Sequence, residues 1–475
     1  MNEYGNAKGN HAMRITRLLP HTVVLVAACA TAARGASTYA RPTVYLEVRA
    51  DEEDALYRVG EKITFSVTAY TCTLSGNNAV KAKNARPVAG VQLKYEITGD
   101  GGMKQTGDLV SSRGPVTIET KLDRPGFVLC AVHEATLDHW WQYRGRGGAG
   151  VEPLKIKAGV TKPADFDAFW KAQLDRLHSQ PIEIVYSERV PNRWHADKID
   201  QFKIKVSSPG TYEGNHNPYV TGWLTKPKNA RARAHPAALH LPGAGVRSPN
   251  PSTRYITNMG FIELTISVHG FDAGKDRDYY RTTARNEMKS WPKNGGTTRA
   301  EWLVRNYERV KFLRVIQALR YLKAQPEWDH KTLVVSGGSQ GGGLSLIAAA
   351  LDPDVTACIA CFPGYCDQYG HRQQHADGWP GMARLGKDGK PVDPIAYAGA
   401  AYFDAAVFAR NITADTVVTT GFIDKTVPPS TVYAAYNPIP ARHKQIINGV
   451  TNGHEGPRWD SVAFLKNHMK RLARR

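Results

Sequence analysis

Residues 333–344 read Leu-Val-Val-Ser-Gly-Gly-Ser-Gln-Gly-Gly-Gly-Leu, an apolar run typical of a buried strand, followed by the pattern G-x-S-x-G and a stretch of small residues. A strand, a turn and a helix around this pattern form a nucleophile elbow, which lifts a serine hydroxyl clear of a sheet. The motif therefore predicts that Ser339 is a nucleophile and that the backbone N–H of Gln340 faces a developing oxyanion. The alternative is an ordinary glycine-rich loop.

An elbow serine requires an acid and then a histidine farther along the chain. Asp424 follows the strand-like run 416–421, and His454 lies in a turn after the apolar run 445–447. A lone carboxylate there would be a helix cap, and a lone histidine a surface residue. Because all three occur in order, they favour a Ser339, Asp424, His454 triad in which His454 takes the serine proton and Asp424 orients the imidazole.

Several segments around these residues resemble the acetyl xylan esterase and cephalosporin C deacetylase family. The resemblance covers the chain from about residue 150 to its end and is most specific in residues 403–437. It implies an α/β-hydrolase fold, with a mostly parallel sheet and helices on both faces, no metal or other cofactor, and deacetylation of acetylated sugars through an acyl-enzyme. The matching segments are 163–170, 337–344, 402–405, 408–410, 421–424, 428–437 and 453–455.

Two segments depart from the family pattern. Residues 242–244 read Pro-Gly-Ala where the family has His-Gly-Tyr, and the resemblance implies that Ala244 supplies the second oxyanion N–H. Residues 269–271 read His-Gly-Phe where the family has Arg-Gly-Gln. The first departure is expected to alter the wall of the acyl pocket, and the second to alter the family's local packing and subunit assembly. The candidates for substrate contact, each with core or loop packing as its alternative, are His269, Phe271, Trp291 and Trp379.

The first residues read as an export signal. Arg14 and Arg17 precede the apolar run 22–28 and the small residues of 30–36, so residues 1–36 are predicted to be a signal peptide. Residues 26–29 also resemble a bacterial lipobox, which would end the signal at residue 28 and make Cys29 a lipid anchor. Both forms predict a secreted or periplasmic protein, the second one anchored at a bacterial surface, and neither predicts a membrane span.

Residues 37–143 contain short strand-like runs separated by turn residues, which predict an immunoglobulin-like β-sandwich. The following Arg-Gly-Arg-Gly-Gly-Ala-Gly, residues 144–150, is dense in glycine and predicts a linker. Residues 151–475, in which strands alternate with helices, are assigned to the hydrolase domain. A chain of 475 residues is long enough for these two domains.

Cysteines and charge suggest other functions that the sequence does not favour. Cys72 and Cys130 are able to pair in an oxidising compartment, although their spacing does not establish a disulfide. Cys358 and Cys361 lie in a strand-like run, and with Cys366 they lack the spacing of a zinc site, so no metal is predicted. The net charge of +19 comes from scattered Lys and Arg. This dispersal favours a solvated basic surface over nucleic-acid binding.

Three function classes follow. The first is an exported serine esterase that removes acetyl groups from an acetylated oligo- or polysaccharide such as acetylxylan. The second is a non-enzymatic glycan-binding protein whose hydrolase domain has lost its substrate pocket through the changes in segments 242–244 and 269–271. The third is a serine esterase or peptidase acting on another ester or amide. The complete triad favours the first class.

Overall fold

The computed structural model describes residues 41–75, 78–137, 145–192, 195–208, 217–255, 259–290 and 296–474. Residues 41–475 form one compact unit. The predicted signal peptide, the lipid anchor at Cys29 and the candidate Trp291 lie outside the described residues. Within the described ranges, every helix is too short or too polar to cross a membrane.

A nine-stranded mixed sheet organises the larger domain, with the strand order β10-β11-β12-β14-β13-β15-β16-β17-β18. The strands from β14 to β18 in this order run parallel to one another, whereas β10, β11 and β12 pair antiparallel at one edge. The strands are β10 (Ile184–Arg189), β11 (Ile199–Ser207), β12 (Tyr219–Pro227), β13 (His235–Leu241), β14 (Ile262–Ser267), β15 (Trp328–Gly338), β16 (Ala357–Cys361), β17 (Asp415–Gly421) and β18 (Lys444–Gly449).

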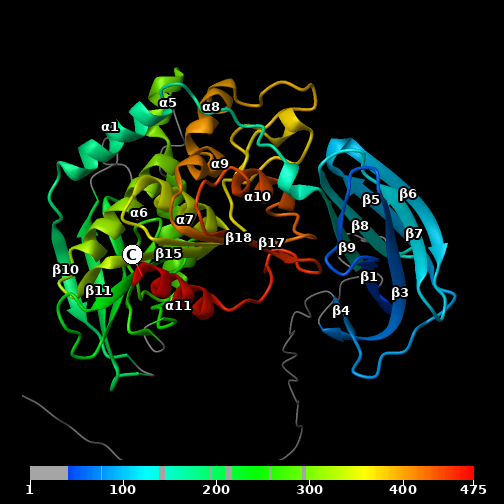
Figure 1. The fold of residues 1–475 in the computed structure, drawn as a ribbon, viewed down its shortest axis with the longest axis horizontal. Coiled ribbons are helices and arrows are strands. Elements are labelled where there is room, and N and C mark those ends of the chain that lie inside the picture. The colour runs from blue at the N-terminus through cyan, green and yellow to red at the C-terminus, as the bar shows by residue number, and fades with distance from the viewer. Residues whose placement is uncertain are drawn as a thin grey trace, which may run out of the picture. The chain divides into compact units, whose positions relative to one another are not determined.

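Helices cover both faces of this sheet (Figure 1). Alternate residues of the parallel strands point to opposite faces, as the two-residue period of a strand requires. Leu239 and Val335 belong to the core beneath α1, α6 and α7, whereas Ala238 and Val334 pack with Leu465 of α11 on the other face. The helices are α1 (Phe166–His178), α3 (Arg277–Tyr279), α4 (Arg285–Ser290), α5 (Arg299–Arg305), α6 (Tyr307–Lys323), α7 (Gln340–Leu351), α8 (Pro394–Gly399), α9 (Ala405–Phe408), α10 (Pro429–Tyr436) and α11 (Ser461–Leu472).

A smaller β-domain precedes this sheet and consists of two sheets around a core of its own. One sheet contains β1, β3, β4 and β7, and the other has the order β2-β9-β8-β5-β6. The strand-like runs of this region, residues 43–48, 63–68, 91–97, 116–119 and 127–132, overlap β1, β3, β5, β7 and β8 in turn. The immunoglobulin-like assignment stays a prediction. The strands are β1 (Val44–Ala50), β2 (Leu56–Tyr57), β3 (Lys62–Ser75), β4 (Asn78–Lys81), β5 (Gln92–Gly99), β6 (Met103–Val110), β7 (Val116–Lys121), β8 (Gly126–Glu134) and β9 (Gly145–Val151).

The predicted linker is wrong for residues 145–150, because they form most of strand β9. Glycine is needed there since the strand is packed closely on both sides. A Cβ atom on Gly145 would lie 2.7 Å from the carbonyl oxygen of Leu46, and one on Gly148 would lie 2.7 Å from that of Phe422. The glycine density therefore reflects close packing and not a flexible connection.

The five cysteines of the described ranges have free thiols. Cys72 lies on β3 in one sheet and Cys130 on β8 in the other, and burial raises the pKa of the Cys130 thiol to about 12. Cys358 and Cys361 lie on β16, as the strand interpretation predicted. Among the described residues, no group of three His, Cys, Asp or Glu side chains is arranged to hold a metal ion.

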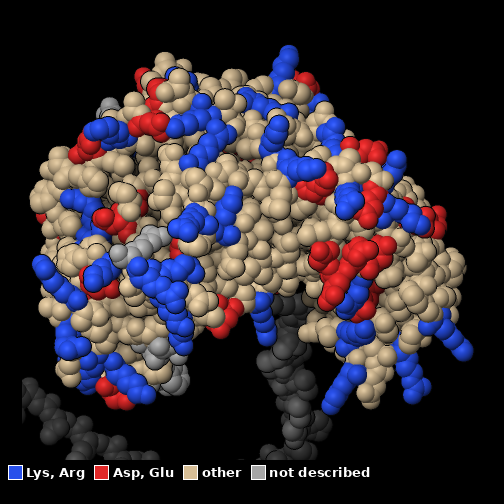
Figure 2. Space-filling model, in the orientation of Figure 1, with Lys and Arg blue, Asp and Glu red and all other residues tan. Residues whose placement is uncertain are grey.

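Charged side chains of both signs are interspersed on the face of the molecule drawn in Figure 2. Many of the cations are paired with carboxylates, for example Lys323 with Asp352 and Asp354. The solvated-surface interpretation of the net charge stays a prediction.

The aromatic cluster around Phe312 provides a test of the core. Its ring lies on α6, is fully buried, and packs against Trp170, Tyr365, Phe403 and Phe408. Phe312→Ala should lower the unfolding free energy by about 3–5 kcal/mol, because the cavity it leaves is bordered by rigid rings.

Urea denaturation measures that change, with Leu154→Ala as the control, since the Leu154 side chain is 67% exposed. An equal loss in the two variants would contradict the assignment of Phe312 to the core.

Candidate active site

Ser339 lies at a strained turn between β15 and α7. Its backbone has φ 57° and ψ −123°, which a residue with a side chain rarely adopts. Two backbone hydrogen bonds hold this conformation: the Ser339 N–H donates to the Cys361 carbonyl at 2.9 Å, and the Gly364 N–H donates to the Ser339 carbonyl at 2.9 Å. The predicted elbow is thus present, and the end of β16 braces it.

The two glycines of the motif are required by close backbone approach. A Cβ atom on Gly337 would lie 2.5 Å from the backbone of Gly341, and one on Gly341 would lie 2.0 Å from the carbonyl oxygen of Leu241. The start of α7 therefore packs directly on the end of β13. The same packing brings Gly243 beside the elbow, where its Cβ position is 3.7 Å from the Ser339 Cβ atom.

His454 bridges the other two residues of the predicted triad. Its Nε2 atom is 2.9 Å from Ser339 Oγ, and its Nδ1 atom is 2.8 Å from Asp424 Oδ2. The Asp424 side chain is completely buried, and its second oxygen accepts backbone N–H groups from Thr426 and Val427. This arrangement holds the imidazole with Nε2 directed at the serine hydroxyl.

The loops that carry the acid and the histidine support each other. The N–H of Phe422 donates to the Gly449 carbonyl, and the N–H of Ile423 donates to the Asn452 carbonyl. The Phe362 ring packs against the imidazole of His454, with ring centroids 5.1 Å apart and an angle of 63° between the ring planes. The histidine is therefore held by a hydrogen bond at each nitrogen and by an aromatic contact on its ring.

The two predicted oxyanion donors belong to two segments at the elbow. Gln340 is the first residue of α7, where a helix leaves its N–H groups without intrahelical acceptors. Ala244 is exposed, in the turn that packs against Ser339 through Gly243. Because both N–H groups belong to segments in contact with the nucleophile, the geometry is compatible with an oxyanion hole.

A buried polar cluster beneath the elbow was not found from the sequence. The ammonium of Lys311 is 2.6 Å from Glu308, donates to the hydroxyl of Tyr365 at 2.9 Å, and contacts the Gln340 side-chain oxygen at 3.4 Å. Burial lowers the pKa of Lys311, and Glu308 opposes that shift. The available signal was three basic residues, Arg309, Lys311 and Arg314, among the apolar residues of helix α6.

Two of the candidates for substrate contact lie in the protein interior. His269 is buried and hydrogen-bonded to the Tyr307 hydroxyl at 2.6 Å, and burial, together with Lys311 and Arg314, lowers its pKa to about 3. Phe271 is 2% exposed, in a small cluster with Tyr280. The surroundings of His269 and Phe271 therefore agree with the alternative of core packing.

Trp379 lies nearer the elbow. It is partly buried, packs against the Tyr365 ring at 5.1 Å, and borders Gly364, whose N–H group holds the Ser339 carbonyl. It stays a candidate for the rim of the site.

Residues 152–468 match the acetyl xylan esterase (AXE1) family. The acetyl esterase Axe7A of Xylanibacter ruminicola is 30% identical over 465 residues, which cover 96% of this chain and 97% of that protein.

Two solved structures share the fold of the larger domain. The acetyl xylan esterase from Paenibacillus sp. R4 aligns with a TM-score of 0.52 at 24% identity, over 68% of this chain and 97% of its own. Acetyl xylan esterase 1 from Thermoanaerobacterium sp. JW/SL YS485 aligns with a TM-score of 0.51 at 23% identity, over 68% and 98%. The larger domain thus has the α/β-hydrolase fold of esterases. Since the family match spans most of the chain, this protein belongs to the acetyl xylan esterase family and is a carboxylic ester hydrolase.

Proposed function

We propose that this protein removes acetyl groups from acetylated oligo- or polysaccharides such as acetylxylan, with Ser339, His454 and Asp424 as its catalytic triad. The observation that carries the proposal is the position of His454, with one ring nitrogen 2.9 Å from the Ser339 hydroxyl and the other 2.8 Å from a buried carboxylate. A histidine held in this way accepts a proton from serine and returns it to a leaving group.

The reaction has two halves. In the first, Ser339 Oγ attacks the acetyl carbonyl while His454 Nε2 takes its proton, and the N–H groups of Gln340 and Ala244 stabilise the oxyanion. The bond between the acetyl carbon and the sugar oxygen then breaks, and His454 gives its proton to that oxygen, which leaves as a sugar hydroxyl. In the second half, His454 removes a proton from water, which attacks the acetyl group on Ser339. Acetate leaves, and His454 restores the proton to Ser339.

Two findings support an acetylated carbohydrate as the substrate. The family matched by residues 152–468 is described as acetyl xylan esterase, and the curated relative is described as an acetyl esterase. We also infer export, from the basic, apolar and small-residue pattern of residues 1–36. The proposed division is an immunoglobulin-like domain followed by the hydrolase domain, with the boundary near residue 151, where β9 ends and the family match begins.

Replacing the nucleophile is the first test. Ser339→Ala should lower the rate of acetate release by at least about 10³-fold, because no other group on the described elbow replaces the attacking oxygen. Acetate release is measured from acetylated xylo-oligosaccharides and from a small aryl acetate, with Ser75→Ala, an exposed serine of β3, as the control. Equal rates for Ser339→Ala and the wild-type protein would overturn the triad.

The same measurement separates mechanism from substrate. Activity on the aryl acetate that depends on Ser339, without release from any acetylated glycan, would keep the triad and remove the proposed substrate class.

Replacing the acid is an independent test. Asp424→Asn keeps the size of the side chain and should lower kcat by about 10⁴-fold, because an amide at this position favours the tautomer whose Nε2 is protonated. Steady-state kinetics on the aryl acetate measure the effect. A kcat within threefold of the wild-type value would exclude Asp424 as the residue that orients His454.

A further inference from the structure

The β-domain contacts the segment that carries the triad's acid. Phe127 lies on β8, yet its side chain belongs to the core of the larger domain. Its ring packs edge to face on Phe422 with centroids 5.0 Å apart, and it also contacts Tyr433 of α10 at 5.5 Å. Phe422 precedes Asp424 by two residues, so a side chain of the β-domain packs against the start of the acid loop.

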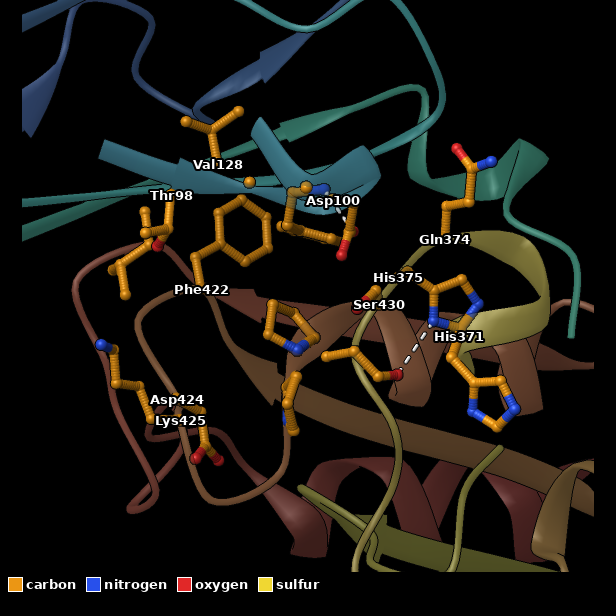
Figure 3. Close-up of a pocket in the computed structure, with 17 residues that line it drawn as sticks. Thr98, Asp100, Val128, His371, Gln374, His375, Phe422, Asp424, Lys425 and Ser430 are labelled. Atoms are coloured by element: carbon orange, nitrogen blue, oxygen red, sulfur yellow. Dashed lines mark hydrogen bonds between the residues drawn. The ribbon is translucent and has the colours of Figure 1, made fainter. Parts of the chain in front are cut away.

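A second contact of the β-domain, from Gly148, also packs closely against Phe422. Gly148 of β9 approaches so closely that a Cβ atom there would lie 2.7 Å from both the Cβ atom and the carbonyl oxygen of Phe422. Figure 3 shows Phe422 beside the strands that carry Thr98 and Val128, with Asp424 farther along its own segment. The backbone of Phe422 is thus confined by Gly148 on one side and by its hydrogen bond to Gly449 on the other.

The β-domain also borders the histidine loop. Ile423 and Thr451 line a hollow of about 370 Å³ together with Val48 and Arg146 of the β-domain. Ile423 is hydrogen-bonded to Asn452, two residues before His454. The acid and histidine loops therefore face the β-domain as one hydrogen-bonded pair.

The β-domain also forms hydrogen bonds with the loop after β16. The N–H of Gly101 donates to the Gln374 carbonyl, and the Arg124 guanidinium donates to the Gln374 side chain. Beside it, the Asp100 carboxylate accepts the Phe127 N–H at 2.9 Å. This loop begins at Phe362, the residue whose ring packs on His454. Each of the two supports of the imidazole outside the elbow, Asp424 and Phe362, thus belongs to a segment that the β-domain contacts.

A cavity of about 550 Å³ lies at this contact. Phe127 is 6% exposed and Phe422 2% exposed, so neither ring presents a free face on which a sugar could stack. The contact is therefore better explained by support of the loops than by recognition of a glycan.

We propose that Phe127 is a positioning residue, through which the β-domain holds the Phe422 to Asp424 segment, and with it His454, in reactive geometry. The proposal rests on the proposed function. A small displacement of a catalytic group lowers the rate far more than it lowers substrate binding, so the β-domain acts on kcat.

The test compares three variants of the full-length protein on the aryl acetate and on acetylated xylo-oligosaccharides. Phe127→Ala should lower kcat by about 10- to 100-fold on both substrates, with KM changed less than threefold. Phe127→Leu keeps an apolar contact with Phe422 and should retain at least a third of the wild-type kcat. Val132→Ala, the matched control, truncates a buried residue of the same strand that belongs to the core of the β-domain and should leave kcat unchanged.

Each result has one interpretation once thermal denaturation shows that the variants are folded at the assay temperature. A wild-type kcat in Phe127→Ala would overturn the proposal. A raised KM on the oligosaccharide alone would also overturn it, in favour of a glycan-binding β-domain. An equal loss in Val132→Ala would replace positioning with general destabilisation.

If Phe127→Ala does not fold, Gly148→Ala gives the second measurement, because its added methyl group should displace Phe422 and lower kcat without removing a contact. A wild-type kcat in Gly148→Ala would then overturn the proposal. Inactivity of the wild-type protein on both substrates would contradict the proposed function, whereas activity that depends on Ser339 but not on Phe127 contradicts only the positioning role.

Discussion

The close approach of three backbone segments at Ser339 is the constraint on which the rest of the site depends. The elbow needs a positive φ at a residue that carries a side chain, at a cost of about 1–3 kcal/mol. Contacts on both sides maintain it: the end of β13 packs against Gly341, and Cys361 and Gly364 hold the serine backbone. His454 lies within hydrogen-bond distance of this strained residue.

The sheet explains why residues more than a hundred positions apart meet at the elbow. Strands β15, β16, β17 and β18 are consecutive and parallel, so their carboxyl ends lie at one edge of the sheet. Ser339 follows β15, Asp424 follows β17 and His454 follows β18. The β-domain contacts the same edge through Phe127 and Gly148, and it belongs to the one compact unit formed by residues 41–475.

Local patterns predicted those parts that local chemistry controls. The apolar runs before Ser339 and before Asp424 each predicted a buried strand, and each strand was found where expected. The glycines of residues 145–150 form no such apolar run, and they were misinterpreted as a linker. Their role depends on Leu46, about a hundred residues earlier, and on Phe422, nearly three hundred residues later. The residues next to these glycines in the sequence do not indicate that Leu46 or Phe422 will pack against them.

The amino-acid sequence by itself determined the order of Ser339, Asp424 and His454, the strands that precede them and the glycines that the elbow requires. Tertiary structure alone decided that His269 and Phe271 are buried, that Lys311 lies beneath Gln340, and that the β-domain packs against the acid loop. The reason is physical: backbone propensity and hydrophobic periodicity act over a few residues, whereas burial, close approach and electrostatic pairing are set by segments that become neighbours only when the sheet forms.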